Sequence, residues 1–286
     1  MSTPTLPLAV ARSLAHPATD PPTLVARVRE ALGWQGSDFL VGLAGYDELM
    51  ATLDVASDLE AIVRIGDPTS PPLRLLRALN AADPAVRLVR VTAVPAPWRW
   101  TRLGGGAGDA EGVALRQQTY SDVVAAMGRA GVAFRVLPDD TTAEELLAIG
   151  AELGSAVVDV DELRPEDLLI VGFLELQPDL TYGLLSRDHA VSVAAGERAQ
   201  VWLSMSAAQE SAGTLMTALE RISALGIDLD FLHSDPVPQA GGVGGDTARH
   251  HFHLGFRSDL AVLPQLQAAL AAVGFASRVL ATFGPV

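Results

Sequence analysis

Hydrophobic positions along the first two thirds of the chain follow two different periods in turn. Apolar runs typical of buried strands lie at 39–43, 59–65, 86–94, 132–137 and 156–160. Apolar residues at helical spacing lie at 23–32, 120–130 and 142–153. Thr23 and Ser121 are candidate N-caps of the first two helices, and Thr141-Thr142-Ala143-Glu144 opens the third. Strands that alternate with helices predict an α/β domain with a mostly parallel sheet.

A different order of elements is predicted for the last third of the chain. The predicted elements are a strand at 200–205, a helix at 211–225, strands at 227–231 and 248–257, a helix at 263–273 and a strand at 276–283. A glycine-rich loop at 235–247 separates the two middle strands. The order β-α-β-β-α-β is that of a ferredoxin-like unit.

Two stretches interrupt these patterns. Residues 1–22 combine prolines with scattered Ser and Thr, and we expect them to form a disordered leader. Residues 95–112 contain three consecutive glycines, and we expect a flexible loop there. Trp98 and Trp100 at its start would either cover a cleft or anchor the loop.

Composition and charge narrow the chemistry. The chain has 34 acidic and 20 basic residues and a net charge of −14, which argues against nucleic acid or an anionic membrane as a partner. It has no cysteine, and all its basic residues are arginines. Disulfides, thiolate nucleophiles, iron–sulfur clusters and lysine Schiff bases are therefore excluded. A small anionic substrate remains compatible, because one or two local arginines suffice to bind it.

Neither a metal, a cofactor nor a membrane anchor is expected. His251 and His253 share one face of a predicted strand, but no third ligand is evident, so an outer sheet face or a dimer contact is the better interpretation. The N-terminus lacks the basic start of a signal peptide, and no apolar run is long enough to span a bilayer. We expect a cytoplasmic protein.

Two motifs in the last third resemble the ACT domain that ends bacterial prephenate dehydratases. Gly213-Thr214-Leu215 resembles the turn that begins its first helix, and His233-Ser234-Asp235-Pro236 stands where the family has E-S-R-P. A glycine at a helix N-terminus admits a ligand carboxylate to free N–H groups. The resemblance spans 197–286 and implies a homodimer and an amino-acid effector. The residues implied to bind it are Gly213, Thr214, Leu215, His233, Ser234 and Asp235.

Residues 23–193 are similar to the catalytic domain of the same family, two α/β lobes built like a periplasmic binding protein around a cleft. The sequence PDLTYGLLSRD stands where the family has N-x-T-R-F. The resemblance makes Thr181 the match of the family's general acid, and Tyr182 the replacement of the arginine that holds a substrate carboxylate. Asp47 follows a turn that borders the cleft, and Arg187 is a further candidate for binding a carboxylate.

The departures from the family pattern decide which function the resemblance implies. A neutral phenol at 182 cannot replace the charged fork of arginine, and Gly183 replaces the family's phenylalanine. We interpret the chain as a diverged lyase acting on prephenate or a related cyclohexadienyl or aromatic acid, such as a non-aromatising decarboxylase of specialised metabolism. Two alternatives stay open. One is a catalytically dead regulatory protein that binds an aromatic amino acid, and the other is a genuine prephenate dehydratase of aromatic amino acid biosynthesis with relocated catalytic residues.

Overall fold

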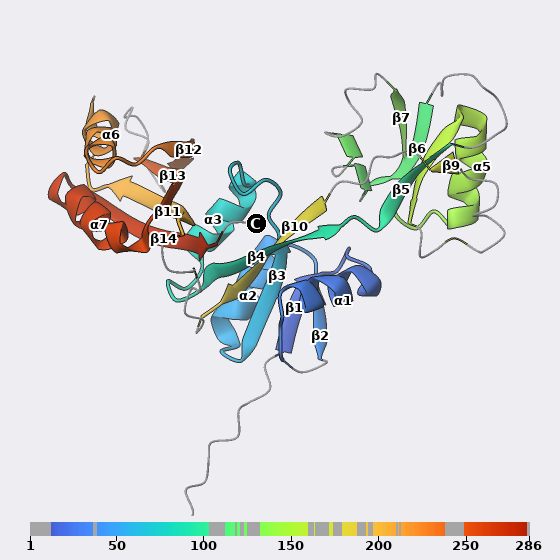
Figure 1. Cartoon of the computed structure of the whole chain (residues 1–286), viewed down its shortest axis with the longest axis horizontal. Coiled ribbons are helices and arrows are strands. Elements are labelled where there is room, and N and C mark those ends of the chain that lie inside the picture. The colour runs from blue at the N-terminus through green and yellow to red at the C-terminus, as the bar shows by residue number, and fades with distance from the viewer. Residues whose placement is uncertain are drawn as a thin grey trace, which may run out of the picture. The chain divides into compact units, whose positions relative to one another are not determined.

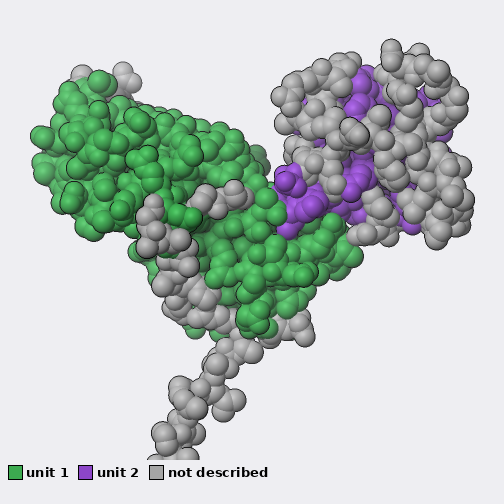
Figure 2. All heavy atoms as spheres, in the orientation of Figure 1, with its two compact units in different colours: residues 1–93, 181–286 green, residues 94–180 purple. Residues whose placement is uncertain are grey.

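The computed structural model describes most of the chain and divides it into two compact units, which Figure 2 distinguishes by colour. Unit 1 comprises residues 1–93 and 181–286, and unit 2 comprises residues 94–180. The described residues are 13–36, 39–102, 112–117, 119–120, 123–124, 132–159, 163, 172–173, 179–187, 193, 197–209, 211, 213–237 and 249–284. The predicted α/β class is confirmed, since helices and strands alternate through most of this length.

The N-terminal part of unit 1 is a sheet of strand order β2-β1-β3-β10-β4 with three helices (Figure 1). Strands β1, β2 and β3 are parallel, and β10 runs antiparallel to β3. The strands are β1 (Ser13–Pro17), β2 (Leu40–Leu43), β3 (Leu59–Arg64), β4 (Arg87–Pro95) and β10 (Asp179–Ser186). The helices are α1 (Pro22–Ala31), α2 (Tyr46–Val55) and α3 (Leu73–Ala81).

Two local expectations for this part were wrong. Residues 13–17 were assigned to the leader, but they form β1, which pairs with both β2 and β3, and residues 1–12 lie outside the described part. Helix α1 begins with Pro22 as its first residue rather than with Thr23 as its cap, because proline fits a position whose N–H has no helical acceptor.

The C-terminal part of unit 1 has the predicted β-α-β-β-α-β order, with a strand order β12-β13-β11-β14 that is ferredoxin-like. Its elements are β11 (Ala199–Ala207), α6 (Thr214–Ala224), β12 (Leu229–Val237), β13 (Arg249–Ser258), the short helix η4 (Leu260–Val262), α7 (Leu263–Ala272) and β14 (Phe275–Phe283). One face packs on α6 and α7 through a core that includes Phe252, Leu254 and Phe256. On its other face, Trp202, Phe231 and Phe283 join the core of the N-terminal part.

Gly183 in β10 has a packing role. A Cβ atom at this position would lie 2.5 Å from Leu88 Cδ1 and 3.1 Å from Ile65 Cγ2, both of which belong to fully buried side chains. Glycine in a strand often marks such a close approach, because any side chain would collide. The apolar residues around Gly183 therefore lie against it rather than around a ligand.

Unit 2 is a sheet of order β7-β6-β8-β5-β9 with helix α5 (Ala143–Leu153). Its strands are β5 (Trp98–Arg102), β6 (Gly112–Arg116), β7 (Ala133–Leu137), β8 (Ser155–Asp159) and β9 (Gly172–Phe173). Helix α5 was predicted at 142–153, and a capping box of Thr142 and Glu145 begins it.

The prediction of a flexible loop at 95–112 was wrong for the first half of this segment. Residues 98–102 form β5, which pairs with β8 and β9, and the buried Trp98 and Trp100 anchor that strand. The three glycines that follow lie outside the described residues, as does most of the helix expected at 120–130.

Candidate functional site

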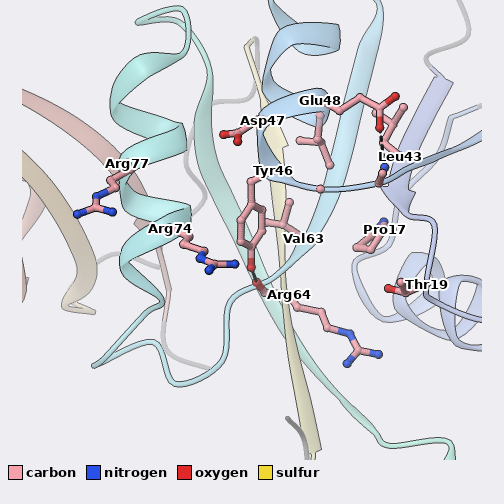
Figure 3. Close-up of a pocket in the computed structure, with 13 residues that line it drawn as sticks. Pro17, Thr19, Leu43, Tyr46, Asp47, Glu48, Val63, Arg64, Arg74 and Arg77 are labelled. Carbon is pink, nitrogen blue, oxygen red and sulfur yellow. Dashed lines mark hydrogen bonds between the residues drawn. The ribbon is translucent and has the colours of Figure 1, made fainter. Parts of the chain in front are cut away.

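A pocket of about 760 Å³ lies in unit 1 at the carboxyl ends of the parallel strands β1, β2 and β3 (Figure 3). Its walls are the segments that follow β1 and β2, the first turn of α2, the end of β3 and one side of α3. In open α/β sheets, ligands bind at this edge, because the loops there converge while the strands hold them in place. The pocket is therefore the candidate site of this unit.

A network of three side chains fixes the end of β3 beside the pocket. Arg64 donates from Nε to Asp20 Oδ1 and to the Tyr182 hydroxyl, both at 2.9 Å. Tyr182 in turn donates its hydroxyl hydrogen to Asp20 Oδ2, also at 2.9 Å. Tyr182 and Arg64 are register partners on β10 and β3, which places both side chains on one face of the sheet. Burial raises the pKa of the Tyr182 phenol, so it stays neutral, and its carboxylate partner is Asp20 of the same chain.

Tyr46 and Arg74 define the middle of the pocket. Tyr46 donates its hydroxyl hydrogen to the carbonyl oxygen of Arg64 at 2.9 Å, and burial raises the pKa of this phenol too. The guanidinium of Arg74, from the first turn of α3, points toward Tyr46 (Figure 3). Arg74 is exposed and pairs with no carboxylate among the described residues. A charged fork with unused donors next to an aromatic ring suits a ligand that has both a carboxylate and a ring.

Two acidic side chains lie on the opposite wall, in the first turn of α2. Glu48 accepts a hydrogen bond from the backbone N–H of Ala44 at 2.7 Å and so holds the loop that precedes the helix. Asp47 is exposed, and within the described residues its carboxylate accepts no hydrogen bond of this kind. The pocket is thus lined by the carboxylates Asp47 and Glu48 and by three arginines, Arg64, Arg74 and Arg77.

No protein-family model matches this sequence, and no curated protein matches it either. Solved structures do resemble the chain. A prephenate dehydratase from Staphylococcus aureus subsp. aureus Mu50 superposes with a TM-score of 0.61 at 12% identity, covering 95% of this chain and 100% of that one. A prephenate dehydratase from Arthrobacter aurescens in complex with L-Phe gives a TM-score of 0.61 at 16% identity, covering 96% and 90%.

The chain has the fold of the prephenate dehydratases. A third structure, GqqA, described as a novel type of quorum-quenching acylase, gives a TM-score of 0.57 at 14% identity over 96% of this chain and 98% of that one. Proteins with different named activities therefore share this fold, so the activity has to be argued from the site.

The structure separates the four residues predicted for the catalytic site. Asp47 lines the pocket, and Tyr182 bonds to Arg64 at its edge. The half-buried Thr181 precedes Tyr182 on β10, and its carbonyl oxygen accepts the N–H of Ile65 at 3.0 Å. Arg187 follows the other end of β10, where it donates to Asp83 at 2.7 Å and to the carbonyl oxygen of Leu53. Arg187 thus joins the ends of two helices rather than the pocket.

The residues predicted to bind an effector are also separated. Gly213 and Thr214 line a second pocket of about 550 Å³ at the start of α6, where Gly213 has a φ of 87°. Leu215 is partly buried against the core under α6. On β12, Ser234 is exposed, while the buried Asp235 bonds to Arg77 of α3.

The face of β13 that carries His251 and His253 is not an outer face, contrary to the sequence interpretation. His253 is 1% exposed, and His251 Nδ1 lies 2.8 Å from Asn80 Nδ2 of α3. No group of side chains suited to hold a metal ion occurs within the described ranges. No helix in these ranges is long and apolar enough to cross a bilayer.

Two residues of the site were missed by the sequence interpretation. Asp20 fell in the expected leader, and Arg74 lies in a helix that was not predicted. Leu75, Leu76 and Leu79 recur at helical spacing after Pro71 and Pro72, which is a signal for a helix that begins there. For Asp20 the sequence offers no signal, since its partners Arg64 and Tyr182 are distant along the chain.

Proposed function

We propose that this chain is a diverged lyase that acts on prephenate or a related cyclohexadienyl acid in the pocket at the carboxyl ends of β1 to β3. The observation that carries the proposal is the guanidinium of Arg74, which pairs with no carboxylate in the described part of the chain and points toward Tyr46 in a pocket of about 760 Å³. A pocket lined by both guanidinium and carboxylate groups offers what is needed to bind an acid and to transfer a proton.

In this proposal the substrate carboxylate binds to Arg74 rather than to position 182. Tyr182 cannot provide a charged fork, and its hydroxyl is already bonded to Asp20 and Arg64. The ring of the substrate would lie against Tyr46. Charge-assisted hydrogen bonds to a carboxylate contribute about 1.5–3 kcal/mol each, which is enough to orient a small acid.

The reaction breaks the bond between the ring and its carboxylate, which leaves as carbon dioxide. The released electron pair then either expels the ring hydroxyl, which must be protonated, or is itself protonated on the ring. Both routes consume one proton. Asp47, which lines the pocket, is the candidate to deliver it. Thr181 on β10 is the match of the family's general acid, but it is not among the described residues that line this pocket.

The first experiment is to incubate the purified full chain with prephenate and to identify the products by NMR and mass spectrometry. A non-aromatic decarboxylated product that keeps its hydroxyl would support the decarboxylase, and phenylpyruvate would support a dehydratase with relocated residues. Decay of prephenate only at its rate in buffer would refute the proposal.

Substitution of Arg74 tests the site itself. Arg74→Gln is expected to lower kcat/KM by roughly ten- to a hundredfold, because it removes a charged hydrogen-bond pair of about 1.5–3 kcal/mol. Arg257→Gln is the matched control, since Arg257 is a largely exposed arginine of β13 that lies outside the pocket and makes a long ion pair with Asp230, at 3.7 Å. Equal rates for the two variants would exclude Arg74 as the carboxylate ligand.

A specific observation also favours ligand binding at α6 as a second function. The pocket of about 550 Å³ is lined by Gly213 and Thr214 at the start of that helix, which has N–H groups available for a carboxylate. We infer an amino-acid effector there and a homodimer, as in the resemblance to ACT domains. Titration with L-phenylalanine, followed by calorimetry and by light scattering for the mass, tests both.

A further inference from the structure

Helix α3 is bound to the C-terminal part of unit 1 by a bidentate ion pair. Arg77 Nε donates to Asp235 Oδ2 at 2.7 Å, and Arg77 Nη2 donates to Asp235 Oδ1 at 2.5 Å. Parallel N–H···O bonds of this kind fix both the distance and the orientation of the two groups. Hydrogen bonding from Arg77 holds the pKa of the Asp235 carboxyl below its usual range. One turn later, Asn80 bonds to His251 at 2.8 Å.

Both ends of α3 are held by the same C-terminal strands. Before the helix, the carbonyl oxygen of Pro68 accepts the indole N–H of Trp202 at 3.0 Å. After it, the guanidinium of Arg278 donates to the carbonyl oxygens of Asn80, Ala82 and Asp83 at 2.7–2.9 Å. Strands β11, β12, β13 and β14 each contribute a side chain to these bonds, so the ferredoxin-like part sets where α3 lies.

The same helix carries Arg74 into the pocket. Arg74 and Arg77 are one turn apart on α3, and both line the pocket. Arg74 points toward Tyr46, whereas Arg77 points away from it (Figure 3). Residues three apart in a helix move together, because the backbone hydrogen bonds between turns keep it rigid. A shift of α3 that follows loss of the Asp235 contact would therefore move Arg74 relative to Tyr46.

The geometry points to Asp235 as a positioning residue: through Arg77 it fixes α3 and thereby places the Arg74 guanidinium for a carboxylate ligand in the pocket. The identity of the ligand as a carboxylate rests on the function proposed above, whereas the effect of Asp235 on the position of α3 does not. Asp235 thus couples the ferredoxin-like part to the pocket, although the sequence marked it as a ligand-binding residue.

The charged and titratable groups around Asp235 show what its carboxylate contributes to the contact with α3. On the same face lie His233 and His251 on the two strands β12 and β13, together with His253, whose Nε2 is 4.0 Å from Asp235 Oδ2. Arg77 packs on this face from α3. A neutral amide at 235 would lose the charge-assisted bidentate pair with Arg77, which is the contact that holds α3 on this face.

The test compares Asp235→Asn, the conservative Asp235→Glu and the matched control Asp230→Asn. Asp230 lies on the same strand but bonds to Gln200 and not to α3. Prephenate affinity is measured by calorimetry, and hydrogen exchange of the amides at 73–81 is followed by mass spectrometry without ligand. Asp235→Asn is expected to weaken prephenate binding about five- to thirtyfold and to speed exchange in α3, with partial recovery in Asp235→Glu and no change in Asp230→Asn.

The double variant Asp235→Asn with Arg74→Gln distinguishes a positioning role of Asp235 from a general loss of structure. If Asp235 acts through Arg74, Asp235→Asn adds no further loss of affinity to Arg74→Gln, whereas equal losses in both backgrounds would overturn the inference. Unchanged exchange at 73–81 in Asp235→Asn would overturn it as well. If the wild-type protein binds no prephenate, the proposed function fails, and the exchange data alone decide whether Asp235 fixes α3.

Discussion

Replacing Gly183 by alanine is expected to destabilise unit 1, because the added methyl group has no space. Its carbon would lie 2.5 Å from Leu88 Cδ1 and 2.9 Å from Leu88 Cγ, and Leu88 is fully buried. Overpacking of this kind costs about 1–3 kcal/mol. Alanine also restricts the unfolded chain, which offsets about 0.4–1 kcal/mol of that cost. We therefore expect a net loss of about 1–2 kcal/mol, or a fall in Tm of roughly 2–8 °C.

The assay is urea unfolding followed by far-UV circular dichroism, with the midpoint compared at constant m. Gly42→Ala is the matched control, since Gly42 is also a strand glycine but is exposed, and its Cβ would lie 3.4 Å from Ala18 Cα and Cβ. The control is expected to change stability by less than about 0.5 kcal/mol.

A double-mutant cycle with Leu88→Ala tests whether the clash with Leu88 causes the loss of stability in Gly183→Ala. Leu88→Ala alone should cost about 2–5 kcal/mol through the cavity it leaves. In the double variant the new methyl group occupies part of that cavity, so the loss should be smaller than the sum by about 1 kcal/mol. A Gly183→Ala protein as stable as Gly42→Ala, or an additive cycle, would refute the packing argument.

Three further variants test other contacts of unit 1. Tyr182→Phe should cost about 1–3 kcal/mol in urea unfolding, because the buried Asp20 loses a hydrogen-bond donor, and an unchanged midpoint would show that the network is not stabilising. Gly255→Ala should destabilise at least as much as Gly183→Ala, because its Cβ would lie 2.1 Å from Phe231 Cε1; wild-type stability would contradict this packing. Burial lowers the pKa of His253 to about 4, below its ordinary 6.5, so the unfolded chain takes up this proton first. Stability should therefore fall by up to about 3 kcal/mol as the pH drops from 6.5 to 4, and His253→Phe should flatten this slope. An equally steep slope in His253→Phe would assign the acid effect to other groups.

The type and order of most elements followed from local patterns. The six elements of the ferredoxin-like part were predicted in order, because each has a clear period and the helices end at glycines such as Gly226. Helix α5 was predicted from its apolar residues at helical spacing after Thr141-Thr142-Ala143-Glu144, and the structure adds a capping box between Thr142 and Glu145. Such signals act between neighbours along the chain, so they survive without any tertiary information.

The sequence by itself thus determined the α/β class, the order of the ferredoxin-like elements and the restriction to arginine, histidine, hydroxyl and carboxylate chemistry. Only the tertiary structure decided that residues 13–17 are a strand, that Asp20 meets Tyr182, and that Asp235 bonds to Arg77 of α3. The periodicity of a segment reports which of its faces is buried, but not what covers that face. That choice depends on contacts between residues far apart in the chain, which form only when the sheets and helices pack together.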